Sequence, residues 1–134
     1  MICTSKPYTL PTVEFIGGTT TSLLFRTYFR DTNKQFDLSC YSAVFSLINY
    51  VNEYGIPFSK DMEITEELNS KNNEMIPTVL RVTLTPDETK NLEGKYIYQI
   101  MINGSAGESE SQQGIFYIYN NIDKNNVGMY GGIA

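Results

Sequence analysis

Short stretches in which apolar and polar residues alternate recur along this chain, and turn-forming residues separate them. Alternation with a period of two places every second side chain on one face of a β-strand. The clearest run is residues 78–84, where Leu80, Val82 and Leu84 are predicted to face the core. Further strands are predicted over residues 12–16, 21–30, 41–51, 95–103 and 108–119.

Two of these predicted strands carry an ambiguity. Residues 41–51 read YSAVFSLINYV, and the second face of this segment is also apolar through Val44 and Ile48, so a helix is the rival interpretation. The content of tyrosine, valine, phenylalanine and isoleucine favours a strand. In the last predicted strand, Gly114 indicates a bulge or a point of close backbone approach. An acidic segment around residues 57–67 is predicted to form an edge strand or a short helical turn that faces water.

The segment over residues 84–102 reads LTPDETKNLEGKYIYQIMI and predicts a capped turn followed by a strand. Thr85 can cap one helical turn, and Glu88 stands three positions later, where its side chain can complete a capping box. The turn stops at Leu92, and Gly94 lets the chain reverse. The strand that Tyr96 opens then has alternate residues predicted to be buried, namely Tyr96, Tyr98, Ile100 and Ile102.

About seven short strands without a convincing long helix predict an all-β fold, an immunoglobulin-like antiparallel β-sandwich. In such sandwiches a tyrosine near the start of the penultimate strand bonds back to the preceding corner, and Tyr96 is predicted to do so. The alternative is an ordinary loop-to-strand junction. We expect an N-terminal arm over residues 1–11, the sandwich domain over residues 12–119 and a C-terminal tail over residues 120–134.

Composition narrows the possible functions of this 134-residue chain. Its net charge is −5 and its cations are dispersed, so nucleic-acid binding, which needs a basic face, is not expected. Histidine is absent, which excludes Ser-His-Asp and Cys-His relays. Cys3 and Cys40 are predicted to be free thiols. With neither a signal peptide nor a membrane span in evidence, synthesis in the cytoplasm is expected, and no membrane partner.

Three groups of acidic residues are candidates for chemistry. A calcium site at Asp61, Glu63, Glu66 and Glu67, or at Asp87 with Glu88, would suit oxygen-binding cations, but neither group has the spacing of a known calcium loop. Glu108 and Glu110 alternate along one strand, a spacing that would suit the carboxylate pair of a glycosidase, although their serine- and glutamine-rich surroundings favour a solvated rim. No catalytic residue, cofactor or metal is therefore predicted, and the chain is not expected to be an enzyme.

A surplus of apolar residues is the more informative feature. If Tyr96 and Tyr98 are buried, Ile97 and Met101 must point to the opposite face of their strand. Neighbouring strands would add Val44, Ile48 and Tyr117 to that face. Contiguous exposed apolar patches usually mark contact with another protein, so these residues are predicted to form a partner interface. In the alternative, the tail or the acidic segment after Pro57 covers them.

Three phrases in order resemble those of a known family. Residues 37–45 read DLSCYSAVF, residues 92–100 read LEGKYIYQI and residues 114–118 read GIFYI. Together they resemble the immunoglobulin-like domains of tailed-phage structural proteins, particularly the N-terminal domain of baseplate upper proteins. The family has Thr-Gly where this chain has Ser39 and Cys40.

This resemblance implies a non-enzymatic phage or prophage tail component, located in the virion, that assembles with other tail proteins or with itself as a homo-oligomer. The alternative is a module that binds carbohydrate on a cell surface, such as a host glycan. Such a module would use exposed aromatic residues, for which the candidates are Tyr28, Tyr50, Tyr54 and Tyr117. The absence of tryptophan, the favoured stacking residue, counts against it.

Overall fold

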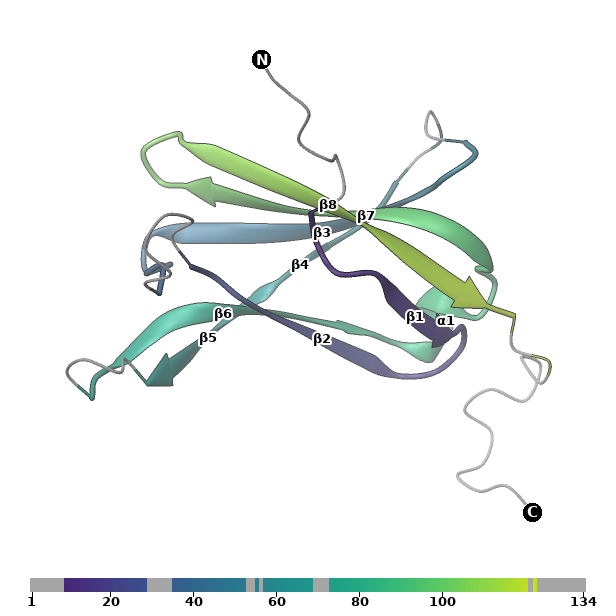
Figure 1. Cartoon of the computed structure of the whole chain (residues 1–134), viewed down its shortest axis with the longest axis horizontal. Coiled ribbons are helices and arrows are strands. Elements are labelled where there is room, and N and C mark those ends of the chain that lie inside the picture. The colour runs from purple at the N-terminus through teal and green to yellow at the C-terminus, as the bar shows by residue number, and fades with distance from the viewer. Residues whose placement is uncertain are drawn as a thin grey trace.

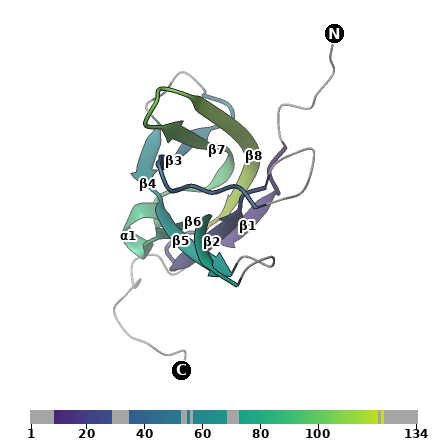
Figure 2. The same ribbon diagram turned by 90° about the vertical axis from the view of Figure 1, so that its left-hand side faces the viewer.

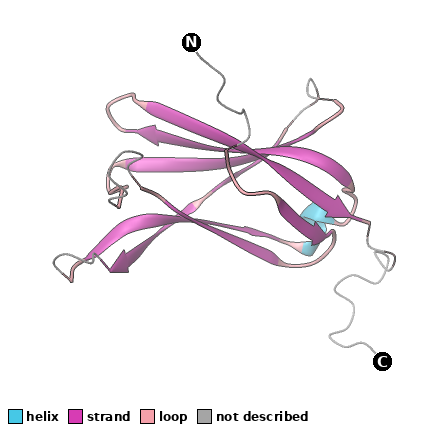
Figure 3. Ribbon diagram, in the orientation of Figure 1, coloured by secondary structure: helices cyan, strands magenta, loops and turns pink. Residues whose placement is uncertain are grey.

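A computed structural model describes residues 9–28, 35–52, 55, 57–68, 73–120 and 122. Within these residues, eight strands form two sheets that pack face to face, and one short helix connects two of the strands (Figures 1 and 3). Viewed from one end, the sheet that contains β7 and β8 lies over the sheet that contains β2 and β6 (Figure 2).

Five strands make up the larger sheet. In spatial order they are β1 (Val13–Ile16), β8 (Ser109–Tyr119), β7 (Gly94–Gly104), β3 (Tyr41–Asn49) and β4 (Phe58–Asp61). The smaller sheet has the order β2 (Thr21–Arg26), β6 (Met75–Leu84) and β5 (Glu63–Leu68), and the helix α1 (Pro86–Thr89) leads from β6 towards β7.

The strand order is that of an immunoglobulin-like sandwich. The second strand pairs with the sixth in one sheet, while the third pairs with the seventh and the seventh with the eighth in the other. This is the arrangement of the immunoglobulin fold, in which an extra strand beside the third is a common addition. Strand β4 is that addition here, and β1 pairs in parallel with β8. The predicted all-β sandwich of immunoglobulin-like type is confirmed.

The acidic segment is the main difference from the predicted seven strands. It forms two strands, β4 and β5, which belong to different sheets. The chain changes sheet at Met62, whose side chain is 8% exposed and whose amide donates to the carbonyl of Ala43 at 2.9 Å. A single buried methionine between acidic residues is a weak signal, and the sequence pattern therefore merged the two strands into one segment.

The core lies between the sheets and is rich in aromatic rings. Phe45, Tyr98 and Phe116 have no exposed surface, and their ring centroids are 5.5–6.1 Å apart. Residues 41–49 form strand β3, with alternate residues buried, so the rival helix is wrong. The inward residues predicted for β6 and β7 face this core; they are Leu80, Val82, Leu84, Tyr96, Tyr98, Ile100 and Ile102.

Gly114 does not produce a bulge. It pairs with Tyr98 in an uninterrupted antiparallel register between β7 and β8. A Cβ atom at Gly114 would lie 2.6 Å from Cε1 of Tyr98 and 3.0 Å from Cβ of Leu10. The glycine therefore leaves the space that the Tyr98 ring occupies, and the close approach involves side chains rather than the backbone.

Candidate interaction surface

The outer face of the five-stranded sheet, turned away from the other sheet, carries the predicted interface residues. Val44 pairs with Met101, and Ile48 pairs with Ile97. Tyr117 lies on the adjacent strand β8, opposite Lys95. Because residues opposite one another on paired strands share a face, the structure brings these side chains onto one surface.

Ile97 is buried although it faces outward. Its side chain is 6% exposed, because Ile48 on β3 and Ile115 on β8 are its cross-strand neighbours. Ile97 was expected to be an exposed contact residue, and the structure corrects this expectation. Ile97 therefore lies beneath the outer surface of the sheet, where its neighbours Ile48 and Ile115 are half-buried.

Apolar side chains are also exposed at the edge of the sheet. On the parallel pair β1 and β8, Ile16 lies opposite Tyr119. The two side chains are 52% and 51% exposed, respectively. Sequence reasoning missed Ile16, because its position depends on a parallel pairing between strands about a hundred residues apart. For Tyr119, the available signal was that Tyr117 and Tyr119 are two positions apart on β8 and therefore face the same side of the sheet.

Polar groups on this face are largely paired with one another. Nε2 of Gln113 donates to Oε1 of Gln99 at 2.9 Å, next to the apolar residues. Nζ of Lys95 lies 3.9 Å from the centroid of the Tyr50 ring, within the range of a cation–π contact. Paired polar groups cost less to transfer from water into an interface than unpaired ones.

The acidic segment does not cover this outer face. Strand β4 extends the same sheet beside β3, and β5 belongs to the other sheet. The alternative in which the acidic segment covers the predicted interface residues is therefore wrong. The tail, the other proposed cover, lies outside the described residues apart from positions 120 and 122.

The corner before β7 forms as a capped turn. Oγ1 of Thr85 accepts a hydrogen bond from the amide of Glu88, and the Glu88 carboxylate accepts from the amide of Thr85. Nζ of Lys60 on β4 contacts the same carboxylate at 3.0 Å. Burial would raise the pKa of Glu88, but the hydrogen bonds from Thr85 and Lys60 outweigh it and lower this pKa. Gly94 has a φ of 107°, a conformation that favours glycine.

The tyrosines of this region have roles that differ from those predicted. Tyr96 is half-buried against the core, as is Leu92, and its hydroxyl has no hydrogen-bond partner within the described residues. Tyr98 has a bonded hydroxyl instead, which donates to the carbonyl of Pro11 at 2.5 Å. The corner itself is bound to the first turn of the fold by Oγ1 of Thr89, which accepts from the amide of Gly18 at 2.9 Å.

Two residues of the acidic segment, Glu63 and Glu67, form ion pairs. Glu67 accepts from Arg26 at 2.9 Å and from Gln35 at 2.6 Å, and the Gln35 bond is the largest cause that lowers its pKa. Oε2 of Glu63 lies 4.0 Å from Nε of Arg81. Over the described ranges, no three acidic or cysteine side chains are grouped as metal ligands.

The candidate glycan-stacking tyrosines do not share one surface. Tyr28 forms a bridge with Gln35 beyond the end of β2, whereas Tyr50 follows β3 beside Lys95, with Tyr117 opposite that lysine. Tyr54 lies outside the described residues.

Cys40 is an exposed free thiol, and Cys3 also lies outside the described residues. No described helix has the length and apolar character needed to span a membrane.

Comparisons with known proteins add little to this picture. No protein-family model matches the chain, and no curated protein matches it. Among solved structures, it is similar to the first Ig-like domain of the human CD48 antigen, with 10% sequence identity and a TM-score of 0.35. That match covers 98% of this chain and 95% of the CD48 domain. At this TM-score the immunoglobulin-like assignment rests on the strand order instead.

Proposed function

We propose that this domain is a non-enzymatic assembly module, and that the outer face of its larger sheet binds another protein of a phage or prophage tail, a second copy of the chain included. One observation supports the proposal above all. Ile16 and Tyr119, each more than half exposed, lie on the same outer face as Val44, Ile48 and Met101. Exposed apolar side chains gathered on one face commonly mark a protein–protein contact.

The place of this module in a tail structure rests on the resemblance of three sequence phrases to baseplate upper proteins. These phrases surround the start of β3, the start of β7 and the end of β8, which all belong to the larger sheet. The family-like residues therefore lie on three of the four strands that carry the proposed contact surface.

Light scattering behind a sizing column tests self-assembly. Over a hundredfold range of concentration, the wild-type chain is expected to reach a fixed multiple of its 15.2 kDa mass. Ile16→Asp is expected to return it to the monomer without unfolding it, because Ile16 lies at an exposed sheet edge. Leu24→Asp is the matched control, since Leu24 is 62% exposed on the smaller sheet. Equal effects of the two variants would contradict the proposed surface.

A wild-type monomer at every concentration would exclude a second copy as the partner. The tail assignment has its own test, which is detection of the chain by antibody labelling in tailed particles purified after induction of the host cell. Its absence from such particles would refute the virion role, whereas the surface on β1, β3, β7 and β8 would still be judged by the two variants.

A further inference from the structure

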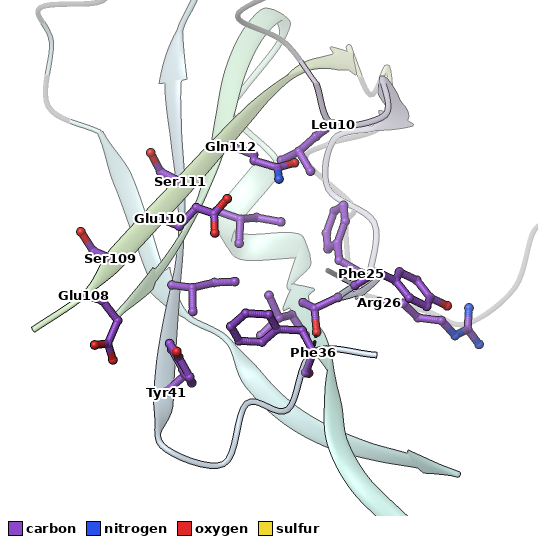
Figure 4. Close-up of a pocket in the computed structure, with 15 residues that line it drawn as sticks. Leu10, Phe25, Arg26, Phe36, Tyr41, Glu108, Ser109, Glu110, Ser111 and Gln112 are labelled. Carbon is purple, nitrogen blue, oxygen red and sulfur yellow. Dashed lines mark hydrogen bonds between the residues drawn. The ribbon is translucent and has the colours of Figure 1, made fainter. Parts of the chain in front are cut away.

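A cavity of about 460 Å³ opens between the two sheets, at the end of the sandwich where the hairpin between β7 and β8 turns. Its walls come from the edge strand β2 and the first half of β8 (Figure 4). The cavity is separate from the outer face of the larger sheet, because its lining residues include inward-facing core residues such as Leu80 and Ile100.

The apolar wall is formed by half-buried side chains that are already held in place. The Phe36 and Tyr41 rings make an edge-to-face contact with centroids 5.2 Å apart. The Phe25 ring lies 6.0 Å from that of Tyr98 in the core. An apolar ligand group would therefore meet a preformed surface, with little ordering cost at these rings.

The opposite wall is acidic because the alternation of side chains along β8 turns a carboxylate towards the cavity. On β8, Phe116 and Ile118 face the core, so Glu110 and Gln112 face the same side at the other end of the strand. Glu110 lies opposite Ile102, and its side chain extends from β8 towards the apolar wall in Figure 4. Carboxylates at core-facing positions keep this end of the sandwich open, because an unpaired charge is costly to bury.

The charge of the cavity is negative. Glu108 and Glu110 are exposed and form no ion pair with any described residue. Arg26 is the cation among the described lining residues, but its guanidinium bonds Glu67 at 2.9 Å and points away from the cavity in Figure 4. A ligand with positive charge therefore complements the rim.

Within the described residues, the backbone beside the cavity is a strand edge without a second partner strand. In the described part of the chain, β1 pairs with β8 only from Phe116 onward, and the amide of Leu10 bonds the carbonyl of Gln113 at 3.0 Å. Among the described residues, the backbone of residues 109–112 pairs with β7 alone, and Oγ1 of Thr9 donates to the side-chain Oε1 of Gln112 at 3.2 Å. Such an edge presents unpaired amide and carbonyl groups that can accept an added strand.

From these three features we propose that the cavity binds an extended, basic segment of another protein as an added strand beside residues 109–112 of β8. Lysine or arginine side chains of the segment would meet Glu108 and Glu110, and an apolar side chain between them would contact Phe25 and Phe36. The four-residue edge is about 13 Å long, so a segment of four or five residues fills it. A segment with alternating lysine and apolar residues on one face would contact both the acidic wall and the apolar wall.

A peptide titration followed by NMR of the full ¹⁵N-labelled chain tests this site. The probe is acetyl-Thr-Lys-Thr-Val-Thr-Lys-Thr-amide, which presents lysine, valine and lysine on one face of a strand. Its counterpart has glutamate in place of both lysines. The lysine peptide is expected to cause saturable shifts at the amides of residues 25–28 and 108–112, and the glutamate peptide none. Saturation without any preference between the two peptides would overturn the proposal, as would no saturable shift.

Two variants that each replace a glutamate by a lysine provide a matched comparison of the site with a remote position. Glu110→Lys is expected to weaken binding of the lysine peptide at least tenfold, since it places a cation in the cavity. Glu93→Lys makes the same change of charge in an exposed loop before β7 and is expected to leave binding unchanged. Equal affinities in the two variants would overturn the site. So would slow hydrogen exchange at residues 109–112 in the free protein, because the chain itself would then occupy the edge.

Discussion

The hydroxyl of Tyr98 donates a hydrogen bond to the backbone carbonyl of Pro11 at 2.5 Å, across 87 residues of sequence. The ring of Tyr98 is fully buried in the centre of the core, while Pro11 precedes strand β1. This bond therefore links the segment before β1 to the centre of the sandwich, and burial of the ring raises the pKa of the Tyr98 hydroxyl well above its ordinary value.

Tyr98→Phe is expected to lower the free energy of unfolding by about 0.5–1.5 kcal/mol, because it removes this hydrogen bond and keeps the ring. Urea unfolding followed by far-ultraviolet circular dichroism measures the change. Tyr96→Phe is the control, because the Tyr96 hydroxyl has no partner within the described residues and its loss should cost under about 0.5 kcal/mol. A larger loss in Tyr96→Phe would restore the tyrosine corner that the sequence predicted.

Gly114→Ala is expected to destabilise the fold by about 1–3 kcal/mol through overpacking of the core. The added methyl group would lie 2.6 Å from the Tyr98 ring, which other core rings hold in place. Thermal unfolding measures the effect. Ser111→Ala, at an exposed position of the same strand, is expected to change stability by less than about 0.5 kcal/mol. Equal stabilities of the two variants would show that the Tyr98 ring can move aside.

Local patterns predicted most of the strands and their inward faces, and the structure shows physically why. Alternation on β6 and β7 requires only neighbouring residues, and so does the capping box of Thr85 and Glu88. The strand assignment of residues 41–49 over the helix also followed from local residue types. Structural features that depend only on residues close in sequence can therefore be predicted from short stretches of the chain.

Features that depend on long-range pairing were not predictable in the same way. The exposed pair of Ile16 and Tyr119 exists because β1 pairs in parallel with β8, a register that no local pattern specifies. Burial of Ile97 likewise depends on Ile48 and Ile115, which lie on two other strands. The inward direction of Glu110 could have been predicted, because Glu110 and Phe116 are an even number of positions apart on one strand and therefore face the same side. Carboxylates, however, are rarely expected on a core-facing side.

Glu88→Gln is expected to lower stability at pH 7 and to have a smaller effect in acid. The pKa of Glu88 in the folded protein lies below its ordinary value of 4.5. A lowered folded-state pKa contributes stability that is present above pH 4.5 and is lost as the pH falls through the folded-state value. Urea unfolding of both proteins at pH 7 and at about pH 3 measures the difference, which should shrink at the lower pH.

Asp87→Asn is the matched control for this pH dependence. Asp87 lies in the same turn, its side chain is 89% exposed, and its contact with Lys90 is 3.3 Å long. Exposed ion pairs of this kind contribute little, typically up to about 1 kcal/mol. The same pH dependence in both variants would mean that the net charge of the turn, rather than the contacts of Glu88 with Thr85 and Lys60, stabilises the corner.

Glu14→Gln is expected to lower the pKa of Tyr119 towards its ordinary value of 10. The Tyr119 hydroxyl donates to the Glu14 carboxylate across the β1–β8 pair, and this bond is the main cause that raises the pKa of Tyr119. The stabilisation from a raised pKa is present below pH 10 and is lost as the pH rises through the folded-state value. An NMR titration of the tyrosine Cζ signals compares the wild type with Glu14→Gln and with the remote control Glu93→Gln. An unchanged Tyr119 pKa in Glu14→Gln would show that the two side chains do not meet in solution, and it would weaken the case for an ordered contact edge at Ile16 and Tyr119.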